Sequence, residues 1–294
     1  MKFLPVIIVL LFSCGHTDER SLFDTHPPTK NGNSNGYEEE VIEEEDSEVF
    51  YDYTDSDEGI VVEDNGIVEN DVVFSSIISV EYPLKVYLPE GYETHNDYPV
   101  VYVLDAEWAF SVIQKYIVKY EYKALVVGVS NNGTRNYDYM PENQCFDDGG
   151  GYENYHKFLI SELVPYIDSK YKTDKSNRAL AGHSFSGAMS LITLFHEDEG
   201  NPVFNRFIAS DPSILCHPEF FNNLISLKSD SRRVIKLHVS KSNQNTYHLT
   251  EFANLLQELK YSWLEIYWHE YTDKDHNQAM EPSFKNGLKF LFEG

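Results

Sequence analysis

The sequence lacks the features that most directly indicate a membrane-spanning, nucleic-acid-binding or metal-binding protein. Its apolar run at residues 3–12 is about half of the roughly 20 residues that a transmembrane helix needs. Basic residues are scarce, with 23 Lys and Arg against 48 Asp and Glu, and they form no stripe that would bind nucleic acid. Because no cluster of Cys, His and Asp suggests a metal site, we expect neither a metal nor another cofactor.

Cysteine is also scarce, with 3 residues in the chain. Residues 1–13 carry one lysine before the short apolar run, which is typical of a signal peptide. The motif LFSC at residues 11–14 resembles the lipobox of bacterial lipoproteins, and this resemblance implies a lipidated Cys14 that anchors the protein in the cell envelope. An ordinary secretory signal is the alternative. Cys145 and Cys216 are then left as a disulfide or as two free thiols.

The segment after the predicted signal peptide is strongly acidic. Residues 17–71 hold 19 Asp and Glu against 2 basic residues, which gives −17 of the total charge of −25. A segment with high net charge and few apolar residues cannot offset the entropy lost on folding. We therefore expect a disordered tether over residues 14–71 and a single folded domain over residues 72–294.

The folded part alternates between strand and helix patterns. Continuous apolar runs at residues 99–104 and 123–130 are typical of strands buried on both faces, and a strand pair is expected within residues 78–92. The alternation predicts an α/β fold with a mostly parallel central sheet and helices on both faces. Further strands are expected at residues 178–182, 204–210, 234–239 and 263–268, and helices at 152–171, 185–195, within 217–228, 249–260 and 283–292.

The stretch RALAGHSFSGAMS at residues 178–190 has the pattern of a nucleophile elbow. Such an elbow needs a strand, a tight turn of small residues around a serine, and a helix. Ser184 is the candidate nucleophile, although Ser186 occupies the place of the last glycine of G-x-S-x-G and Gly187 follows it. The alternative is a structural serine in a turn.

In this type of site the acid and then the histidine follow the serine along the chain. The base must lie in a loop at the carboxyl ends of the parallel strands. His276, in the stretch TDKDHNQAME between the last strand and the last helix, fits best, and His269 at the end of that strand is the second choice.

The acid is less clear, because the loop after the strand at 234–239 has no carboxylate before Glu251. Asp211 follows the preceding strand and lies before Pro212. The alternatives are Glu251 on the next predicted helix, an amide of Asn243 or Asn245 that orients the histidine, or a Ser–His dyad without an acid.

Several stretches in order make residues 80–294 similar to a known family. They include VYLPEGYETHNDYPVVYVLDAEWAF, VVGVSNNGTRNYDYMP, ELVPYIDSKYKTDKSNRALAGHSFSG, IASDPSIL and DHNQAMEPSFKNGLKFLF. These resemble the esterase family of α/β-hydrolases that includes esterase D and the enterobactin-type siderophore esterases. The resemblance implies an α/β-hydrolase fold and a serine carboxylic ester hydrolase. Its substrate would be a carbohydrate ester, a siderophore lactone or a small acyl ester.

The resemblance also implies roles for individual residues. Ser184 would attack the ester, and His276 would act as the base. The oxyanion would be held by the backbone N–H groups of Phe185 and of Ala106 or Glu107. Segments that line the cleft in the family contribute the substrate-binding candidates Trp108, Arg135 and Tyr139.

Two other functions remain open at this stage. The altered elbow and the missing acid after the strand at 234–239 leave room for a catalytically inactive hydrolase fold that serves as a surface binding protein. The same serine chemistry would also support acyl transfer to a carbohydrate. We expect the protein to be a monomer that is attached to the membrane only by its lipid. The only partner that we expect is its substrate, a small-molecule or carbohydrate ester.

Overall fold

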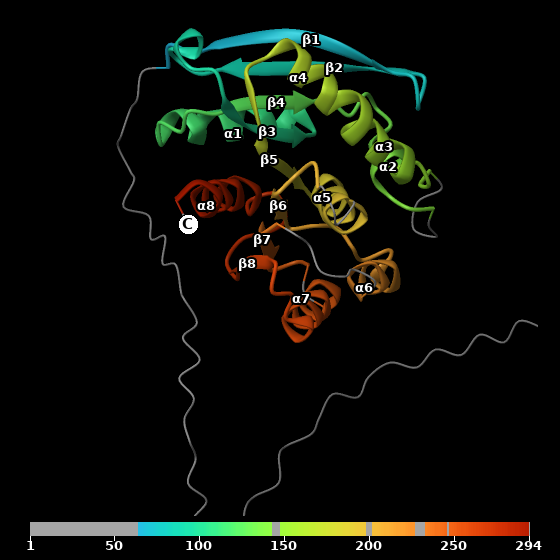
Figure 1. Cartoon of the computed structure of the whole chain (residues 1–294). Helices are drawn as coiled ribbons and strands as arrows, with labels where there is room; N and C mark the ends of the chain where they lie inside the picture. The colour runs from blue at the N-terminus through green and yellow to red at the C-terminus, as the bar shows by residue number, and fades with distance from the viewer. Residues whose placement is uncertain (1–63, 143–147, 198–201, 227–232, 246, 294) are drawn as a thin grey trace, which may run out of the picture. The chain divides into compact units, whose positions relative to one another are not determined.

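The computed structural model describes residues 64–142, 148–197, 202–226, 233–245 and 247–293 (Figure 1). The predicted signal peptide, Cys14 and the expected tether up to residue 63 lie outside these described residues, as does Cys145. Over the described ranges, every helix is too short or too polar to cross a bilayer.

The described residues alternate between strands and helices from the amino to the carboxyl end. The strands are β1 (Ile67–Ser75), β2 (Val80–Leu88), β3 (Tyr98–Leu104), β4 (Leu125–Val129), β5 (Thr173–His183), β6 (Arg206–Ser210), β7 (Ile235–Ser242) and β8 (Leu264–Tyr271). The helices are α1 (Ala106–Lys119), α2 (Arg135–Tyr139), α3 (Tyr152–Phe158), α4 (Val164–Lys170), α5 (Phe185–His196), α6 (Pro218–Ser226), α7 (Tyr247–Leu259) and α8 (Met280–Glu293). A short 3-10 turn, η1 (Tyr92–Thr94), precedes β3, and a π-helical turn, η2 (Leu159–Leu163), joins α3 to α4.

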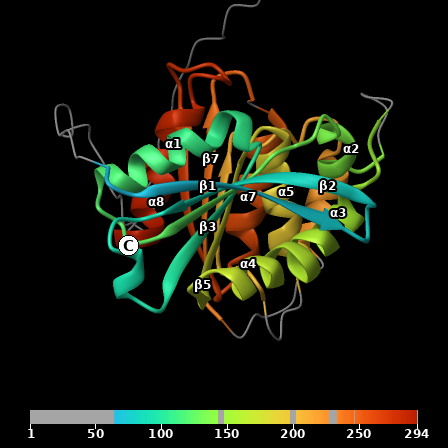
Figure 2. The same cartoon turned by 90° about the horizontal axis from the view of Figure 1, so that it is seen from above.

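All eight strands form one sheet in the order β1-β2-β4-β3-β5-β6-β7-β8. Strands β3 to β8 are mutually parallel, whereas β2 runs antiparallel to both β1 and β4. The edges of the sheet are strongly rotated relative to one another, as expected from the regular twist of strands (Figure 2). This arrangement confirms the predicted α/β-hydrolase fold with a mostly parallel central sheet.

Helices cover both faces of the sheet, so each face has its own apolar core. Helices α1 and α8 pack on one face and bury side chains such as Ile113 and Phe284 against the sheet (Figure 1). The remaining long helices pack on the other face, where Phe158, Leu191 and Phe252 are fully buried. Strands covered on both faces carry few polar residues, which is why β3 and β4 are continuous apolar runs in the sequence.

The expected start of the domain at residue 72 is wrong, because β1 begins at Ile67. The acidic residues of this strand have partners on the domain, and their charge therefore does not oppose folding. Asp71 accepts hydrogen bonds from Lys170 at 2.7 Å and from Tyr166 at 2.8 Å, and Glu69 accepts one from Tyr171 at 3.0 Å. Strand β1 is also the partner of β2, so the stretch at 78–92 contains one strand instead of the expected pair.

Candidate active site

Ser184 lies in the tight turn between β5 and α5. Its backbone angles are φ 63° and ψ −122°, a region that non-glycine residues rarely occupy. Such strain is typical of a nucleophile elbow, in which the turn lifts the serine hydroxyl above the end of the sheet. The backbone is held there by hydrogen bonds between Ser184 N–H and the Ser210 carbonyl at 3.0 Å and between Ser213 N–H and the Ser184 carbonyl at 3.0 Å.

The residues around the turn explain how Ser186 replaces the expected glycine. A side chain at Gly182 would lie 2.3 Å from the backbone of Ser186, so glycine is required there. Ser186 is fully buried and turns its hydroxyl back to the residue before the nucleophile. Its Oγ accepts a hydrogen bond from His183 N–H at 2.9 Å and donates one to the His183 carbonyl at 2.8 Å. The departure from G-x-S-x-G therefore adds two hydrogen bonds to the turn.

His276 and Asp211 are brought together from different loops. His276 lies between β8 and α8, and Asp211 follows β6 directly. His276 Nδ1 lies 2.5 Å from Asp211 Oδ2. The Asp211 side chain is 0% exposed and that of His276 is 28% exposed, so a buried carboxylate holds a partly accessible imidazole.

The surroundings of Asp211 keep its side chain ionised. Burial raises the pKa of Asp211, but hydrogen bonds from His276 and from Ser242 outweigh it, and the pKa lies below its usual value. Ser242 N–H at the end of β7 donates to Asp211 Oδ1 at 2.9 Å. Because β6 and β7 are adjacent, a carboxylate after β6 reaches the place that the carboxylate-free loop after β7 leaves open.

The other candidates for the acid lie elsewhere. Glu251 is 45% exposed on α7 and pairs with His248 at 3.4 Å. The side chain of Asn245 donates to the Pro212 carbonyl at 2.9 Å, and the backbone N–H of Asn243 donates to the Lys274 carbonyl at 3.0 Å. These residues support the loops around the site. His269 lies on β8, with its Nδ1 3.5 Å from the Tyr267 hydroxyl, and burial lowers its pKa.

A second histidine, His183, packs against His276 with ring centroids 4.4 Å apart and the ring planes tilted by 33°. Its Nδ1 shares a hydrogen bond with Ser210 Oγ at 3.0 Å. Burial, together with the charge of His276, lowers the pKa of His183 to about 3, so the ring is neutral at physiological pH. A neutral ring next to His276 restricts its orientation without adding a fixed charge.

The two predicted oxyanion donors lie at neighbouring helix starts. Ala106 is the first residue of α1 after β3, and Phe185 is the first residue of α5 after β5. Strands β3 and β5 are adjacent and parallel, with Val103 aligned to Ala181. The first N–H groups of a helix have no acceptor within the helix, so they can bind an anion.

A cavity of about 410 Å³ opens at this edge of the sheet. Its lining residues are Trp108, Arg135, His183, Ser184, His276, Asn277 and Met280. Ser184 and His276 therefore share one accessible space. Ser184 Oγ itself lies 3.0 Å from Ser213 Oγ, with which it shares a hydrogen bond.

Two of the three predicted substrate-binding residues line this cavity. The side chain of Trp108 is largely exposed at 53%, and Arg135 lies beside it. Tyr139 is 0% exposed in the hydrophobic core, which corrects the expectation that it contacts substrate. Sequence reasoning did not single out His183, Ser213, Asn277 or Met280, because no catalytic pattern specifies a residue type at their positions.

Other features of the structure do not add to this site. Within the described ranges, no group of three or more Cys, His, Asp or Glu side chains could hold a metal ion. Cys216 is disulfide-bonded, which excludes the alternative of two free thiols.

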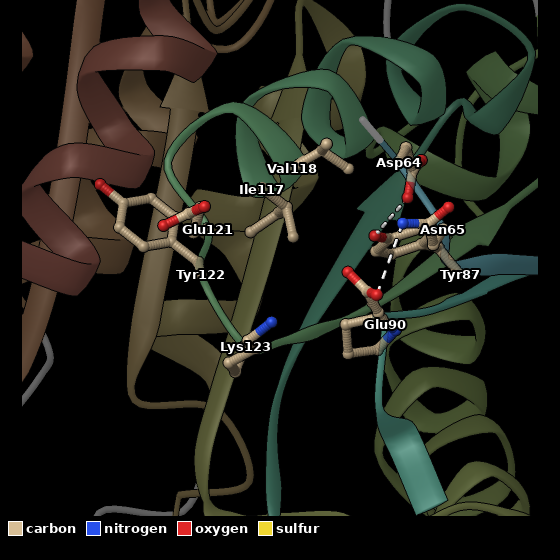
Figure 3. A pocket seen from close by; sticks show the side chains of 10 residues that line it. Asp64, Asn65, Tyr87, Glu90, Ile117, Val118, Glu121, Tyr122 and Lys123 are labelled. Atoms are coloured by element: carbon tan, nitrogen blue, oxygen red, sulfur yellow. Dashed lines mark hydrogen bonds between the residues drawn. The ribbon is translucent and has the colours of Figure 1, made fainter. Parts of the chain in front are cut away.

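A second hollow of about 50 Å³ lies at the far end of α1, between Glu121 and the residues around Asp64 (Figure 3). Two pairs of its polar side chains are hydrogen-bonded: Tyr87 donates to Asp64 at 2.9 Å, and Asn65 donates to Glu90 at 3.4 Å (Figure 3).

Comparison with known proteins agrees with this geometry. A family model described as "Putative esterase" matches residues 75–206. The ferri-bacillibactin esterase BesA of Bacillus subtilis is 23% identical over 233 residues, which cover 66% of this chain and 78% of that protein. These matches confirm the resemblance to the esterase family.

Solved structures share the fold. An IroE-like serine hydrolase from Shewanella oneidensis superposes with a TM-score of 0.70 at 22% identity, over 77% of this chain and 80% of that one. The siderophore hydrolase EstB from Aspergillus nidulans gives a TM-score of 0.66 at 19% identity, over 79% and 97% of the two chains.

Proposed function

We propose that this chain, a serine esterase of the α/β-hydrolase fold, hydrolyses carboxylic esters with Ser184 as nucleophile, His276 as general base and Asp211 as the acid that orients the base. The observation that carries the proposal is the hydrogen bond of 2.5 Å between His276 and the buried Asp211, next to a strained Ser184 that opens on the same cavity. An inactive hydrolase fold would have no need to maintain a strained serine together with a histidine that is hydrogen-bonded to a buried carboxylate.

The first half of the reaction forms an acyl-enzyme. When an ester enters the cavity, the Ser184 hydroxyl turns from Ser213 to Nε2 of His276. His276 takes its proton while Ser184 Oγ forms a bond to the carbonyl carbon. The N–H groups of Ala106 and Phe185 stabilise the oxyanion, and the C–O bond to the alcohol breaks as His276 returns the proton to the leaving oxygen.

The second half of the reaction releases the acid. His276 takes a proton from water, whose oxygen attacks the acyl carbon. The tetrahedral intermediate then collapses, and the proton returns to Ser184 Oγ. Throughout, the ionised Asp211 stabilises the imidazolium form of His276 and holds the tautomer in which Nε2 faces Ser184.

The substrate that we propose to test first is a siderophore ester or lactone. One relative acts on ferri-bacillibactin by its name, and one structural neighbour is named a siderophore hydrolase. The exposed indole of Trp108 and the side chain of Met280 offer an apolar wall for an acyl group, beside the polar Asn277. Carbohydrate esters and small acyl esters are the comparison substrates.

We also propose that the enzyme is a monomer held at the bacterial cell envelope by a lipid on Cys14. The support is the lipobox-like LFSC motif and the long acidic segment that would separate the anchor from the domain.

A hydrolysis assay tests the proposed activity. The full chain is mixed with p-nitrophenyl butyrate, a ferric catecholate trilactone and an acetylated sugar, and release of acid is measured. We expect turnover of the p-nitrophenyl ester and the highest kcat/KM for the trilactone. Lack of turnover on all three, with the folded state shown by circular dichroism, would favour a binding protein.

A further inference from the structure

The loop after β7, which offers no carboxylate for the acid, contacts the loops of both proposed catalytic partners. Strand β7 lies between β6 and β8 in the sheet (Figure 1). Asp211 follows β6 and His276 follows β8, so residues 243–245 leave the sheet between the proposed acid and the proposed base. An acid on β7 would lie directly beside β8, whereas an acid after β6 is one strand further away. The loop after β7 is thus placed where it can set the separation of acid and base.

The side chain of Asn245 holds the acid side. Its Nδ2 donates to the carbonyl of Pro212, the residue after Asp211, at 2.9 Å. Strand β7 itself also binds Asp211. The backbone N–H of Asp211 donates to the Ser240 carbonyl at 3.1 Å, and the N–H of Ser242 donates to the Asp211 carboxylate at 2.9 Å. The chain is therefore attached to β7 and its loop both before and after the side chain of the proposed acid.

The side chain of Gln244 holds the base side. Its Oε1 accepts a hydrogen bond from the backbone N–H of His276 at 3.3 Å. One residue earlier, the N–H of Asn243 donates to the Lys274 carbonyl at 3.0 Å. Two consecutive amides, those of Gln244 and Asn245, therefore contact two different loops, one that carries the base and one that carries the acid.

The turn that carries His276 is closed by a reciprocal pair of hydrogen bonds. Gln278 N–H donates to Asp275 Oδ1 at 2.8 Å, and Asp275 N–H donates to Gln278 Oε1 at 3.1 Å. This arrangement is a capping box, which fixes the chain at the start of a helical turn. Because His276 lies inside this closed turn, a contact to its backbone N–H also positions its imidazole.

Packing does not account for the two amides. Gln244 is exposed and Asn245 is half-buried, and the cavity that opens at Ser184 is lined by other residues. Replacing an exposed polar side chain normally changes the stability of a protein little. A kinetic effect of either amide would therefore have to act through the catalytic residues that it holds.

We infer that Gln244 and Asn245 are positioning residues that hold the base and the acid at hydrogen-bonding distance from each other. Gln244 acts through the backbone of His276. Asn245 acts through the carbonyl of the residue that follows Asp211. The inference rests on the proposed function, in which this base and this acid work as a pair. Since a displacement of about 1 Å costs roughly 100-fold in rate, even a small shift of either loop is measurable.

The directions of the two hydrogen bonds predict opposite outcomes for the same chemical change. The Gln244 amide accepts from an N–H group, and a glutamate carboxylate accepts in the same way. The Asn245 amide donates to a carbonyl, and an aspartate carboxylate cannot donate. Gln244→Glu should therefore keep its contact, whereas Asn245→Asp should bring two oxygens together and lose it.

Steady-state kinetics on p-nitrophenyl butyrate compares these two variants with Gln244→Met and Asn245→Leu, which have similar volumes but no amide. We expect kcat to fall roughly 10-fold in Gln244→Met, Asn245→Leu and Asn245→Asp, with KM changed less than about twofold. Gln244→Glu should stay within about threefold of wild type. Gln257→Met and Asn254→Leu, which change exposed amides on α7, are the matched controls and should equal wild type.

Proton NMR of the free protein gives a readout that does not depend on turnover. The proton on His276 Nδ1 lies in a hydrogen bond of 2.5 Å to a carboxylate, and a proton in so short a bond resonates far downfield. Asp211→Asn identifies this signal by removing it. We expect the signal to move upfield in Gln244→Met and Asn245→Leu. It should stay in place in Gln244→Glu and in both controls.

The outcomes separate the inference from the proposed function. Wild-type kcat in Gln244→Met or in Asn245→Leu overturns the role of that residue and leaves the esterase intact. A fall in kcat with an unmoved downfield signal also overturns the inference, as does an equal loss in Gln244→Glu and Gln244→Met. A wild-type chain that hydrolyses no ester but shows the expected shifts of the signal refutes the proposed function, while the shifts still support the positioning role of the two amides.

Discussion

Asp211 Oδ2 lies 2.5 Å from His276 Nδ1, although 65 residues separate the two in the sequence. Asp211 is the first residue after β6. His276 lies in the loop after β8, which is two strands away from β6 in the sheet. The contact therefore depends on the register of β6, β7 and β8. It also gives the most specific mutational test of the proposed catalytic acid.

Asp211→Asn is expected to lower kcat by roughly 1,000- to 10,000-fold while the chain stays folded. An amide is neutral, so it no longer stabilises the imidazolium form of His276, and it can favour the wrong tautomer. Glu251→Gln is the matched control, because Glu251 is exposed on α7 and should stay near wild type. The kcat of both variants is measured by steady-state kinetics on p-nitrophenyl butyrate. Equal activity of the two variants would remove Asp211 from the mechanism.

Ser186→Ala is expected to lower the free energy of unfolding by about 1–3 kcal/mol, because it leaves the buried N–H of His183 without its side-chain acceptor. Urea denaturation measures the change. Ser190→Ala is the control, since the Ser190 hydroxyl is equally buried but only donates to a carbonyl one turn earlier, that of Ser186. An equal loss in both variants would show that the Ser186 hydroxyl has no special role in the turn.

Acid should destabilise the domain through its buried histidines. Burial lowers the pKa of His238 to about 3, and burial with the charge of His276 does the same for His183. In the unfolded chain both take up a proton near pH 6.5, so below that pH the unfolded state binds more protons than the folded state. The free energy of unfolding should therefore fall between about pH 6.5 and 3, by up to about 1.4 kcal/mol per pH unit for each histidine.

Asp211 affects the free energy of unfolding over a lower pH range than the buried histidines do. Its pKa is lowered in the folded state, so its contribution is complete above about pH 4 and is lost as the pH falls through the folded pKa. Urea denaturation at pH 7, 5 and 4 tests the histidine effect, and His238→Gln should make the fall in the free energy of unfolding with pH less steep. A slope that does not change in this variant would assign the acid sensitivity to other groups.

Cys14→Ser is expected to move the protein from the membrane fraction to the soluble fraction, because the proposed lipid needs the thiol. Palmitate labelling of cells that express each form, followed by fractionation, measures both steps. Kinetics of the soluble form should match those of the anchored form. Unchanged membrane association of the variant would contradict the proposed anchor.

The sequence sufficed for the parts of the molecule that depend on strong local patterns. Apolar runs located β3 and β4, and small residues around Ser184 located the turn between β5 and α5. His276 could be located because its loop, between the last strand and the last helix, lies at the carboxyl ends of the parallel strands, where the structure places it beside Asp211. These features are determined by a few neighbouring residues.

The parts that could not be predicted depend on tertiary contacts. Strand β1 was hidden among acidic residues, whose partners Lys170, Tyr166 and Tyr171 are about 100 positions later in the chain. Arg135 and Tyr139 lie four residues apart on the five-residue helix α2 and so share a face, but only Arg135 reaches the cavity. A helix of five residues is too short for the spacing of its apolar residues to show which side is buried.

Covalent labelling of Ser184 tests the central claim most directly. The full chain is incubated with p-nitrophenyl ethyl butylphosphonate, which transfers its phosphonyl group to an activated serine and releases p-nitrophenolate. Intact-mass and peptide mass spectrometry should find one phosphonyl group, on Ser184, together with the loss of ester hydrolysis. Labelling should be absent in Ser184→Ala and slowed by several orders of magnitude in His276→Ala. Hydrolysis that persists in Ser184→Ala, or a label on any other residue, would contradict the account.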